Sequence, residues 1–142
     1  MNDEILTTRI GALLFRHEGL RLMPYRDSVA KLTIGVGRNL DDRGISREEA
    51  VMLLDNDIRG ALSACRASLP WFDGMDQTRQ AAIVDVVFNL GMSRFLNFHK
   101  ALAAMAAGDW ETAANELLDS KWASQVGIRA KEISEMIRSG SA

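Results

Sequence analysis

Two carboxylates and a hydroxyl stand close together near the start of the chain. Glu18 and Asp27 are nine residues apart, and Thr33 follows six residues later. One carboxylic acid can protonate a leaving group while a second carboxylate, helped by a hydroxyl, activates a water molecule, which is the minimal set for hydrolysing a glycosidic bond. Most Asp and Glu side chains are solvated surface charges, so the hypothesis depends on the elements that carry the acids.

The apolar pattern changes between the two acids from a helical repeat to one that suits short strands. Residues 4–17 are predicted to form a helix with one buried face, because apolar side chains recur three and four positions apart: Ile5, Leu6, Ile10, Leu13 and Leu14. Gly19 can end this helix in a left-handed conformation, which leaves Glu18 in or beside its final turn.

Residues 22–40 are predicted to form a small antiparallel sheet. Pro24, Gly35 and Gly37 are poor residues for continuing a helix, whereas the intervening β-branched and aromatic residues favour strands. Asp27 then lies at a strand end before the turn, and Thr33 begins the returning strand. Both side chains are therefore expected at one edge of a cleft.

This segment resembles the signature of the phage-type lysozymes, which are endolysins of the bacteriophage T4 kind in glycoside hydrolase family 24. That signature has Glu-Gly, then Arg, Tyr and Asp, then Thr-Ile-Gly-x-Gly, and the chain carries Glu18, Gly19, Arg21, Tyr25, Asp27 and Thr33 to Gly37. Further segments resemble the family at Phe88–Gly91, Lys121–Trp122 and Gly127–Ala130. The resemblance spans nearly the whole chain.

The resemblance implies an α+β, mostly helical, lysozyme-like fold in a single domain over residues 1–142. Its small lobe, with an N-terminal antiparallel sheet, is expected at about residues 15–50. The larger helical lobe is expected at about residues 60–142 and includes the N-terminal helix. A long helix is expected to join the two lobes.

The resemblance also implies hydrolysis of the β-1,4 bond between N-acetylmuramic acid and N-acetylglucosamine in peptidoglycan, and so lysis of the host cell wall. Glu18 is expected to be the general acid, and Asp27 and Thr33 to position the attacking water in an inverting, single-displacement reaction. The residues expected to bind substrate are Asn89, Arg129, Leu32 and Phe98. Asn89 is expected to bond a sugar N-acetyl group, and Arg129 to approach Glu18.

Three features depart from the family pattern. Ala30 stands where family members commonly carry glycine, and because alanine is less at ease with positive φ, a different hairpin turn is expected. Arg38 takes the place of a common histidine and is expected to pair with Asp57 on the next helix. Only eight residues separate Gly37 from the helix start at Ser46. The small lobe is therefore expected to lack an extra helix.

The remainder of the chain is predicted to be helical. Ser46 to Glu49 fits a capping box, and the apolar repeat then runs to about Cys65, which is expected to be a core residue. Asp76 is predicted to cap a core helix that ends at Gly91. Shorter helices are predicted at about 99–107, 110–119 and 128–138, and the three tryptophans are expected to be buried anchors.

Composition and charge bound the partners. Hydrophobic residues make up 47% and charged residues 25% of the chain, as in ordinary globular proteins. A net charge of −2 argues against a nucleic-acid binder. Six basic residues between Arg9 and Arg38 form either a positive rim that attracts an anionic cell wall or a solvated face.

No cofactor or metal is expected, because His17 and His99 are far apart and poorly accompanied. No stretch suits a membrane span, and Asp3 and Glu4 do not suit a secretion signal. The expected protein is a monomer without stable membrane association. It is expected to act on glycan strands of the periplasmic wall after holin-mediated release from the host cytoplasm.

Two other functions stay open. The altered hairpin at Ala30 and the exchange at Arg38 suit a non-catalytic peptidoglycan-binding or lysozyme-like protein, since a fold can persist without its chemistry. Retention of Glu18, Asp27 and Thr33 together argues for catalysis. The third candidate is a wall-degrading domain that serves a tail spike or a toxin.

Overall fold

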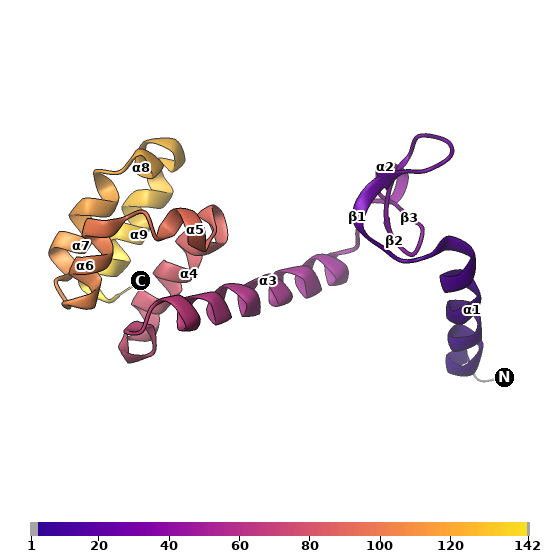
Figure 1. Ribbon diagram of the computed structural model, residues 1–142, viewed down its shortest axis with the longest axis horizontal. Helices are drawn as coiled ribbons and strands as arrows, with labels where there is room; N and C mark the ends of the chain where they lie inside the picture. Colours follow the sequence, from indigo (N-terminus) through magenta and orange to yellow (C-terminus); the bar gives the residue numbers. More distant parts are fainter. Residues whose placement is uncertain (1–2, 142) are drawn as a thin grey trace. The chain divides into compact units, whose positions relative to one another are not determined.

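The computed structural model describes residues 3–141 of the chain. Over these residues the protein is mostly helical and has one three-stranded antiparallel sheet, which confirms the α+β class (Figure 1). Internal contacts divide the chain into two units, Met1–Val51 and Met52–Ala142, and the division falls within helix α3 (Arg47–Ser68). The predicted lobe boundaries, including the place of the N-terminal helix, stay predictions.

The first unit begins with helix α1 (Asp3–Glu18). The helix ends where predicted, because Gly19 has a φ of 73° and its N–H donates to the Phe15 carbonyl over 3.0 Å. The first unit does not bury the apolar face predicted for α1: no residue of the helix is buried within this unit, and Ile10 and Leu13 are 45% and 41% exposed. The sheet of the same unit leaves this apolar face uncovered.

The sheet consists of β1 (Arg21–Arg26), β2 (Leu32–Gly35) and β3 (Arg38–Asn39), in that order and antiparallel throughout. Thr33 lies opposite Tyr25 on β1 and opposite Asn39 on β3. The three strands therefore place Thr33 at the centre of the sheet. Its side chain is the buried polar group of this unit, at 3% exposed.

The expectation that this unit lacks an additional helix is wrong. A single helical turn, α2 (Leu40–Arg43), follows β3 directly. The Asn39 side chain accepts a hydrogen bond from the Asp42 N–H over 2.9 Å and so caps the turn. An asparagine cap thus forms a helical turn within a connection that looked too short for one.

The second unit contains the rest of α3 and a cluster of shorter helices. These are the 3₁₀ turn η1 (Phe72–Gly74) and the helices α4 (Gln77–Leu90), α5 (Met92–Phe95), α6 (His99–Ala106), α7 (Trp110–Leu118), α8 (Lys121–Val126) and α9 (Ile128–Ser139). Asp76 caps α4 and Gly91 ends it, as predicted, and Asp109 caps α7. Helices α5 and α8 were not predicted.

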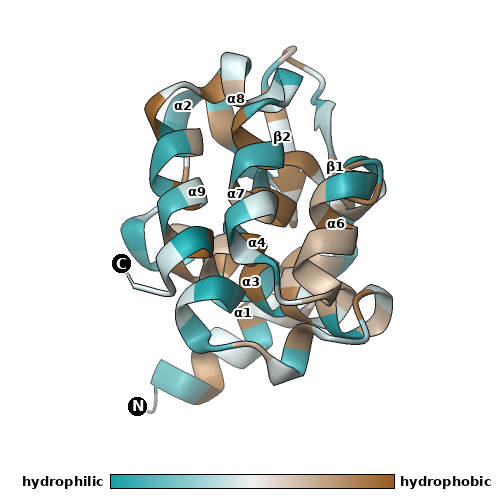
Figure 2. Ribbon diagram, turned by 90° about the vertical axis from the view of Figure 1, so that its left-hand side faces the viewer, coloured by the Kyte–Doolittle hydropathy of each residue, from teal (hydrophilic) through white to brown (hydrophobic). Residues whose placement is uncertain are grey.

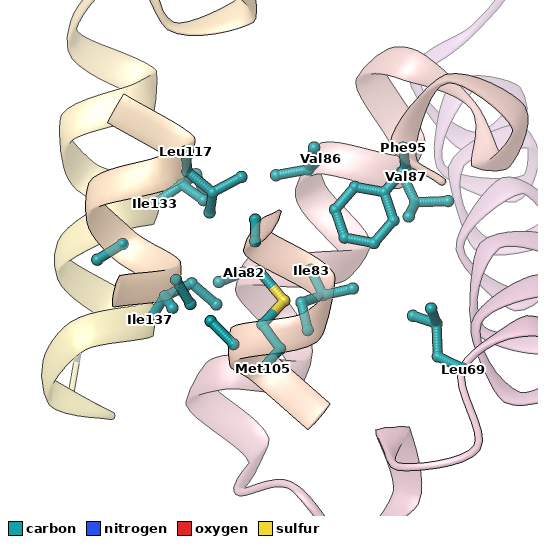
Figure 3. Packing of buried hydrophobic residues seen from close by; sticks show 14 of the residues in the cluster. Leu69, Ala82, Ile83, Val86, Val87, Phe95, Met105, Leu117, Ile133 and Ile137 are labelled. Atoms are coloured by element: carbon teal, nitrogen blue, oxygen red, sulfur yellow. The ribbon is translucent and has the colours of Figure 1, made fainter. Parts of the chain in front are cut away.

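The core of the second unit lies between α4, α7 and α9. In Figure 3, Leu117, Ile133 and Ile137 point toward Ala82 and Val86 of α4. Figure 2 shows α6 mainly in pale brown, whereas α7 and α9 also carry teal, hydrophilic segments. The predicted core helix α4 thus supplies the apolar side chains on which the neighbouring helices pack.

Cys65 and the tryptophans take largely structural positions. Cys65 is fully buried, as predicted, and burial raises the pKa of its thiol to about 11, which makes it a poor nucleophile. Trp122 is buried, whereas Trp71 and Trp110 are only partly buried against the core. Trp122 therefore fits the expected anchor best.

Arg79 fastens the end of the last helix to α4. Its guanidinium donates to the carbonyls of Ile137 over 2.6 Å and of Arg138 over 3.0 Å, near the C-terminal end of α9. It also pairs with Asp76 and lies 4.3 Å from the centre of the Trp110 ring. One side chain thereby satisfies carbonyls that the helix end leaves without intrahelical donors.

Candidate functional site

Glu18 lies in the last residue position of α1, and its side chain is exposed. The carboxyl group lies against the turn between β2 and β3. A Cβ atom added to Gly37 would stand 3.0 Å from the Glu18 Oε2 atom. The helix end therefore places this acid directly beside the sheet, as the sequence predicts.

Asp27 lies in the hairpin turn between β1 and β2 and is partly buried. Its Oδ1 atom accepts hydrogen bonds from the backbone N–H groups of Val29 and Lys31, each over 2.9 Å. Among residues 3–141, none donates to its Oδ2 atom. The main chain therefore fixes one oxygen of the Asp27 carboxylate, while the other oxygen can accept a hydrogen bond from a further donor.

The hairpin turn keeps a left-handed residue at Ala30. Its φ is 65°, and it is the one non-glycine residue with positive φ in the part of the chain that the structure describes. The Ala30 N–H donates to the Asp27 carbonyl over 2.9 Å. The alanine thus adopts the conformation that glycine takes easily, with the strain that this brings to a residue with a Cβ.

Thr33 is tied to Asp27 through the backbone of Lys31. The Thr33 hydroxyl donates to the Lys31 carbonyl over 2.9 Å. The same carbonyl accepts the Asp27 N–H over 2.9 Å, while the Lys31 N–H donates to the Asp27 carboxylate. A single residue's backbone therefore sets the position of both side chains.

Asp41 is a residue of this site that sequence reasoning missed. Its Oδ2 atom accepts the Leu32 N–H over 2.7 Å and a guanidinium hydrogen of Arg26 over 3.2 Å. Asp41 thereby fastens the returning strand next to Thr33. No local pattern marks such a role, because its partners lie nine and fifteen residues away in sequence.

Ion pairs neutralise half of the basic residues between Arg9 and Arg38. Arg26 pairs with Asp41, Lys31 with Asp42 and Arg38 with an acid of α3. The hydrogen bond to Asp42 raises the pKa of Lys31, and the same bond lowers the pKa of Asp42. These six residues therefore do not form a strongly positive rim.

Arg38 was expected to pair with Asp57, but it pairs with Glu49 instead. The Arg38 Nη2 atom lies 2.7 Å from Glu49 Oε2, and Nη1 donates to Oε1 over 2.7 Å. This two-pronged bond, together with the Ser46 donors, lowers the pKa of Glu49 to about 2. Glu49 lies in the first turn of α3, where the predicted capping box with Ser46 holds it within reach of Arg38.

The remaining expected site residues lie in the second unit. The Asn89 side-chain oxygen accepts the indole N–H of Trp122 over 2.9 Å. The Arg129 Nε atom donates to Asp85 Oδ1 over 2.8 Å.

Phe98 makes an edge-to-face contact with Phe95, with ring centres 6.0 Å apart. This contact gives Phe98 a packing role in the core of the second unit. Glu18, Asp27, Leu32 and Thr33 thus all lie in the first unit, while Asn89, Phe98 and Arg129 lie in the second. The expected approach of Arg129 to Glu18 stays a prediction.

No group of three or more His, Cys, Asp or Glu side chains among residues 3–141 has an arrangement that holds a metal ion. No helix in this range has both the length and the apolar character needed to cross a bilayer.

Comparison with known proteins adds a family match and several relatives. The family model described as phage lysozyme matches residues 15–138. An endolysin of Acyrthosiphon pisum secondary endosymbiont phage 1 is 33% identical over 78% of this chain and 74% of its own length. Probable T4-type lysozyme 1 of Dictyostelium discoideum is 24% identical, over 96% and 97% of the two chains.

A further relative is much longer than this chain. The pre-baseplate central spike protein Gp5 of Enterobacteria phage T4 is 28% identical over 98% of this chain. The chain spans only 29% of the length of that spike protein. The matching region is therefore one part of a larger protein in that phage.

Proposed function

The chain belongs to the phage lysozyme family, and on that premise we propose that it is a glycosidase that cleaves the peptidoglycan of the bacterial cell wall. The bond we assign is the β-1,4 link between N-acetylmuramic acid and N-acetylglucosamine. The observation that carries the proposal is the shared anchorage of Asp27 and Thr33 on the backbone of Lys31, beside a helix that ends in Glu18.

Asp27 and Thr33 are suited to orient one water molecule. The only hydrogen of the Thr33 hydroxyl is donated to Lys31, so its oxygen can act toward water only as an acceptor. Asp27 Oδ2 is also an acceptor. A water that donates one hydrogen to each of these oxygens presents a lone pair to the sugar, which is the orientation that nucleophilic attack requires.

The proposed reaction is a single displacement at the anomeric carbon. The water oxygen forms the new bond to this carbon, and the bond to the leaving sugar oxygen breaks. Glu18 gives its proton to that leaving oxygen, and Asp27 receives a proton from the attacking water. The product then has the inverted anomeric configuration, for which paired carboxyl groups stand about 6.5–9.5 Å apart.

We propose that the second unit supplies binding groups. The Asn89 oxygen is occupied by Trp122, so its NH₂ group remains to donate to the carbonyl of a sugar N-acetyl group. Arg129, oriented by Asp85, supplies positive charge for an anionic substrate and for Glu18. Leu32 and Phe98 offer apolar contact for the sugar rings.

The test is release of reducing sugar from purified peptidoglycan. The wild type should release it, and Glu18→Gln should lose nearly all rate because the amide has no acidic proton. Glu132→Gln, on an exposed position of α9, is the matched control and should keep full rate. An inactive wild type would refute the hydrolase, and an active Glu18→Gln would refute the assigned acid.

Two further measurements test the water site and the stereochemistry. Thr33→Val removes the hydroxyl at nearly constant volume and should lower kcat, whereas Thr33→Ser should retain most of the activity. Proton NMR of the first product formed should show the inverted anomer. The retained anomer would overturn the single displacement while leaving the carboxylate pair in place.

The similarity to a spike protein favours a second candidate, a wall-cutting domain carried on a phage particle. The proposed endolysin instead stays in the host cytoplasm, as a monomer, until a holin opens the membrane. An antibody against the chain should detect it in the lysate and not on purified particles. Detection on particles would establish the spike role, and binding of peptidoglycan without sugar release would establish a non-catalytic protein.

A further inference from the structure

Gly37 has two properties that a glycine in a turn need not combine. Its φ is 71°, a conformation that favours glycine. In addition, a Cβ atom at this position would stand 3.0 Å from the Cγ, Cδ and Oε2 atoms of Glu18. A contact of this length is tighter than nine in ten real Cβ contacts, so the Glu18 side chain would have to give way by a few tenths of an ångström. The missing side chain of Gly37 therefore makes room for the Glu18 carboxyl.

Gly35 provides the internal comparison. It lies in the same segment and has the same φ of 71°, yet a Cβ atom there would meet nothing within 4 Å. An alanine at either position carries similar backbone strain. Only an alanine at Gly37 also displaces Glu18.

We propose that Gly37 is a positioning residue for the acid, because its bare backbone forms the surface against which the Glu18 carboxyl is seated. This inference rests on the proposed role of Glu18 as proton donor. Glu18 is exposed, so its side chain can turn away from an added methyl group. The displaced carboxyl then meets the leaving oxygen at a longer distance and a poorer angle, while the sheet and the substrate-binding residues stay in place.

The proposal predicts that Gly35→Ala and Gly37→Ala have different effects on activity and similar effects on folding. Both variants should lose a similar amount of stability in urea, because the strain of a positive φ is common to them. Gly37→Ala should have a kcat several-fold lower than that of Gly35→Ala, because a shift of a few tenths of an ångström is a fraction of the displacement of about 1 Å that costs about 100-fold, and KM should be unchanged. Soluble peptidoglycan fragments are the substrate for both variants.

Asparagine provides a second pair of variants should the alanine variants fold poorly. Among residues with a side chain, asparagine is one that tolerates a positive φ best. Gly37→Asn should again lose kcat relative to Gly35→Asn. Equal kcat values in either folded pair, or a change confined to KM, would overturn the proposal.

An NMR measurement separates failure of this proposal from failure of the proposed function. In the wild type, the Hα protons of Gly37 should show a nuclear Overhauser effect to the Hγ protons of Glu18, whether or not the protein cuts peptidoglycan. In Gly37→Ala the Glu18 side-chain ¹³C resonances should shift, and in Gly35→Ala they should not. Absence of the Overhauser effect would overturn the proposed position of the Glu18 carboxyl against Gly37, even if the protein is an active glycosidase.

Discussion

Ala30→Gly should stabilise the protein, although it removes a methyl group from the hairpin. Ala30 adopts a φ of 65°. The left-handed region costs a residue with a Cβ about 1–2 kcal/mol, and glycine avoids this cost. Glycine gives the unfolded chain more freedom, which offsets about 0.4–1 kcal/mol. The net expectation is a hairpin more stable by about 0.5–1 kcal/mol.

The assay is amide hydrogen exchange in the hairpin, with urea unfolding beside it. The amides of Val29 and Lys31 donate to Asp27 and report directly on opening of this turn. A gain of about 0.5–1 kcal/mol slows their exchange by about two- to fivefold. The rate of sugar release should be unchanged, because the substitution leaves both hydrogen bonds to Asp27 in place.

Ala12→Gly is the matched control for this prediction. It makes the same substitution in the same unit, but at an exposed position inside helix α1, where glycine costs about 1 kcal/mol. The two variants should therefore change stability in opposite directions. Faster exchange of the Val29 and Lys31 amides in Ala30→Gly would refute the argument that Ala30 stores strain.

Three other predictions concern ion pairs and buried groups. The pKa of Glu49 is about 2, against an ordinary value of 4.5, so its ionised carboxylate stabilises the protein above pH about 4.5, and this stability is lost as the pH falls toward 2. The wild type should therefore melt at a higher temperature than Glu49→Gln above pH about 4.5, and the difference should shrink as the pH falls toward 2. An unchanged difference at pH 2 would contradict this. Ser134→Ala should raise the free energy of unfolding in urea by about 0.5–1.5 kcal/mol, because the buried Ser134 hydroxyl has no hydrogen-bond partner among residues 3–141; a lower free energy of unfolding would show a hidden partner. Arg79→Ala should lower the free energy of unfolding by about 2–3 kcal/mol, measured by tryptophan fluorescence in urea, and Arg79→Lys should recover only part of it; full recovery by lysine would refute the role of the guanidinium fork.

The helix ends could be predicted from sequence because each depends on a few neighbouring residues. Asp76 and Asp109 accept N–H groups three residues ahead, and the capping box at Ser46 joins side chains three residues apart. Gly19 also ends α1 through a local bond to Phe15. Such signals hold wherever the segment lies in the fold, which is why these boundaries agree with the structure.

The errors arose where distant residues or competing neighbours decide the outcome. Helix α3 carries acidic residues on more than one turn that could pair with Arg38. The sequence alone does not show that Glu49, which the capping box already fixes, is the one within reach. The turn α2 depends on a single cap at Asn39. The apolar face of α1 follows the helical period correctly, but period alone does not supply the element that covers it.

The candidate site could be proposed from the sequence as a set of residues, whose roles stay predictions, but not as an arrangement. Glu18, Asp27 and Thr33 were found from type, spacing and family resemblance, since these features are written in one short segment. The hydrogen bonds that connect Asp27 with Thr33 run through the main chain of Lys31, whose side chain gives no hint of this role. Asp41 was missed for the same reason, because it acts on the backbone of Leu32.

This reliance on the main chain explains why the exchange at Ala30 need not disable the site. The two donors to Asp27 and the acceptor for Thr33 are peptide groups of Val29 and Lys31, and they require only that the turn reach its left-handed conformation. Alanine reaches it at some cost in stability. The departure from the family pattern therefore bears on how firmly the hairpin is folded, whereas the geometry of Asp27 and Thr33 is preserved.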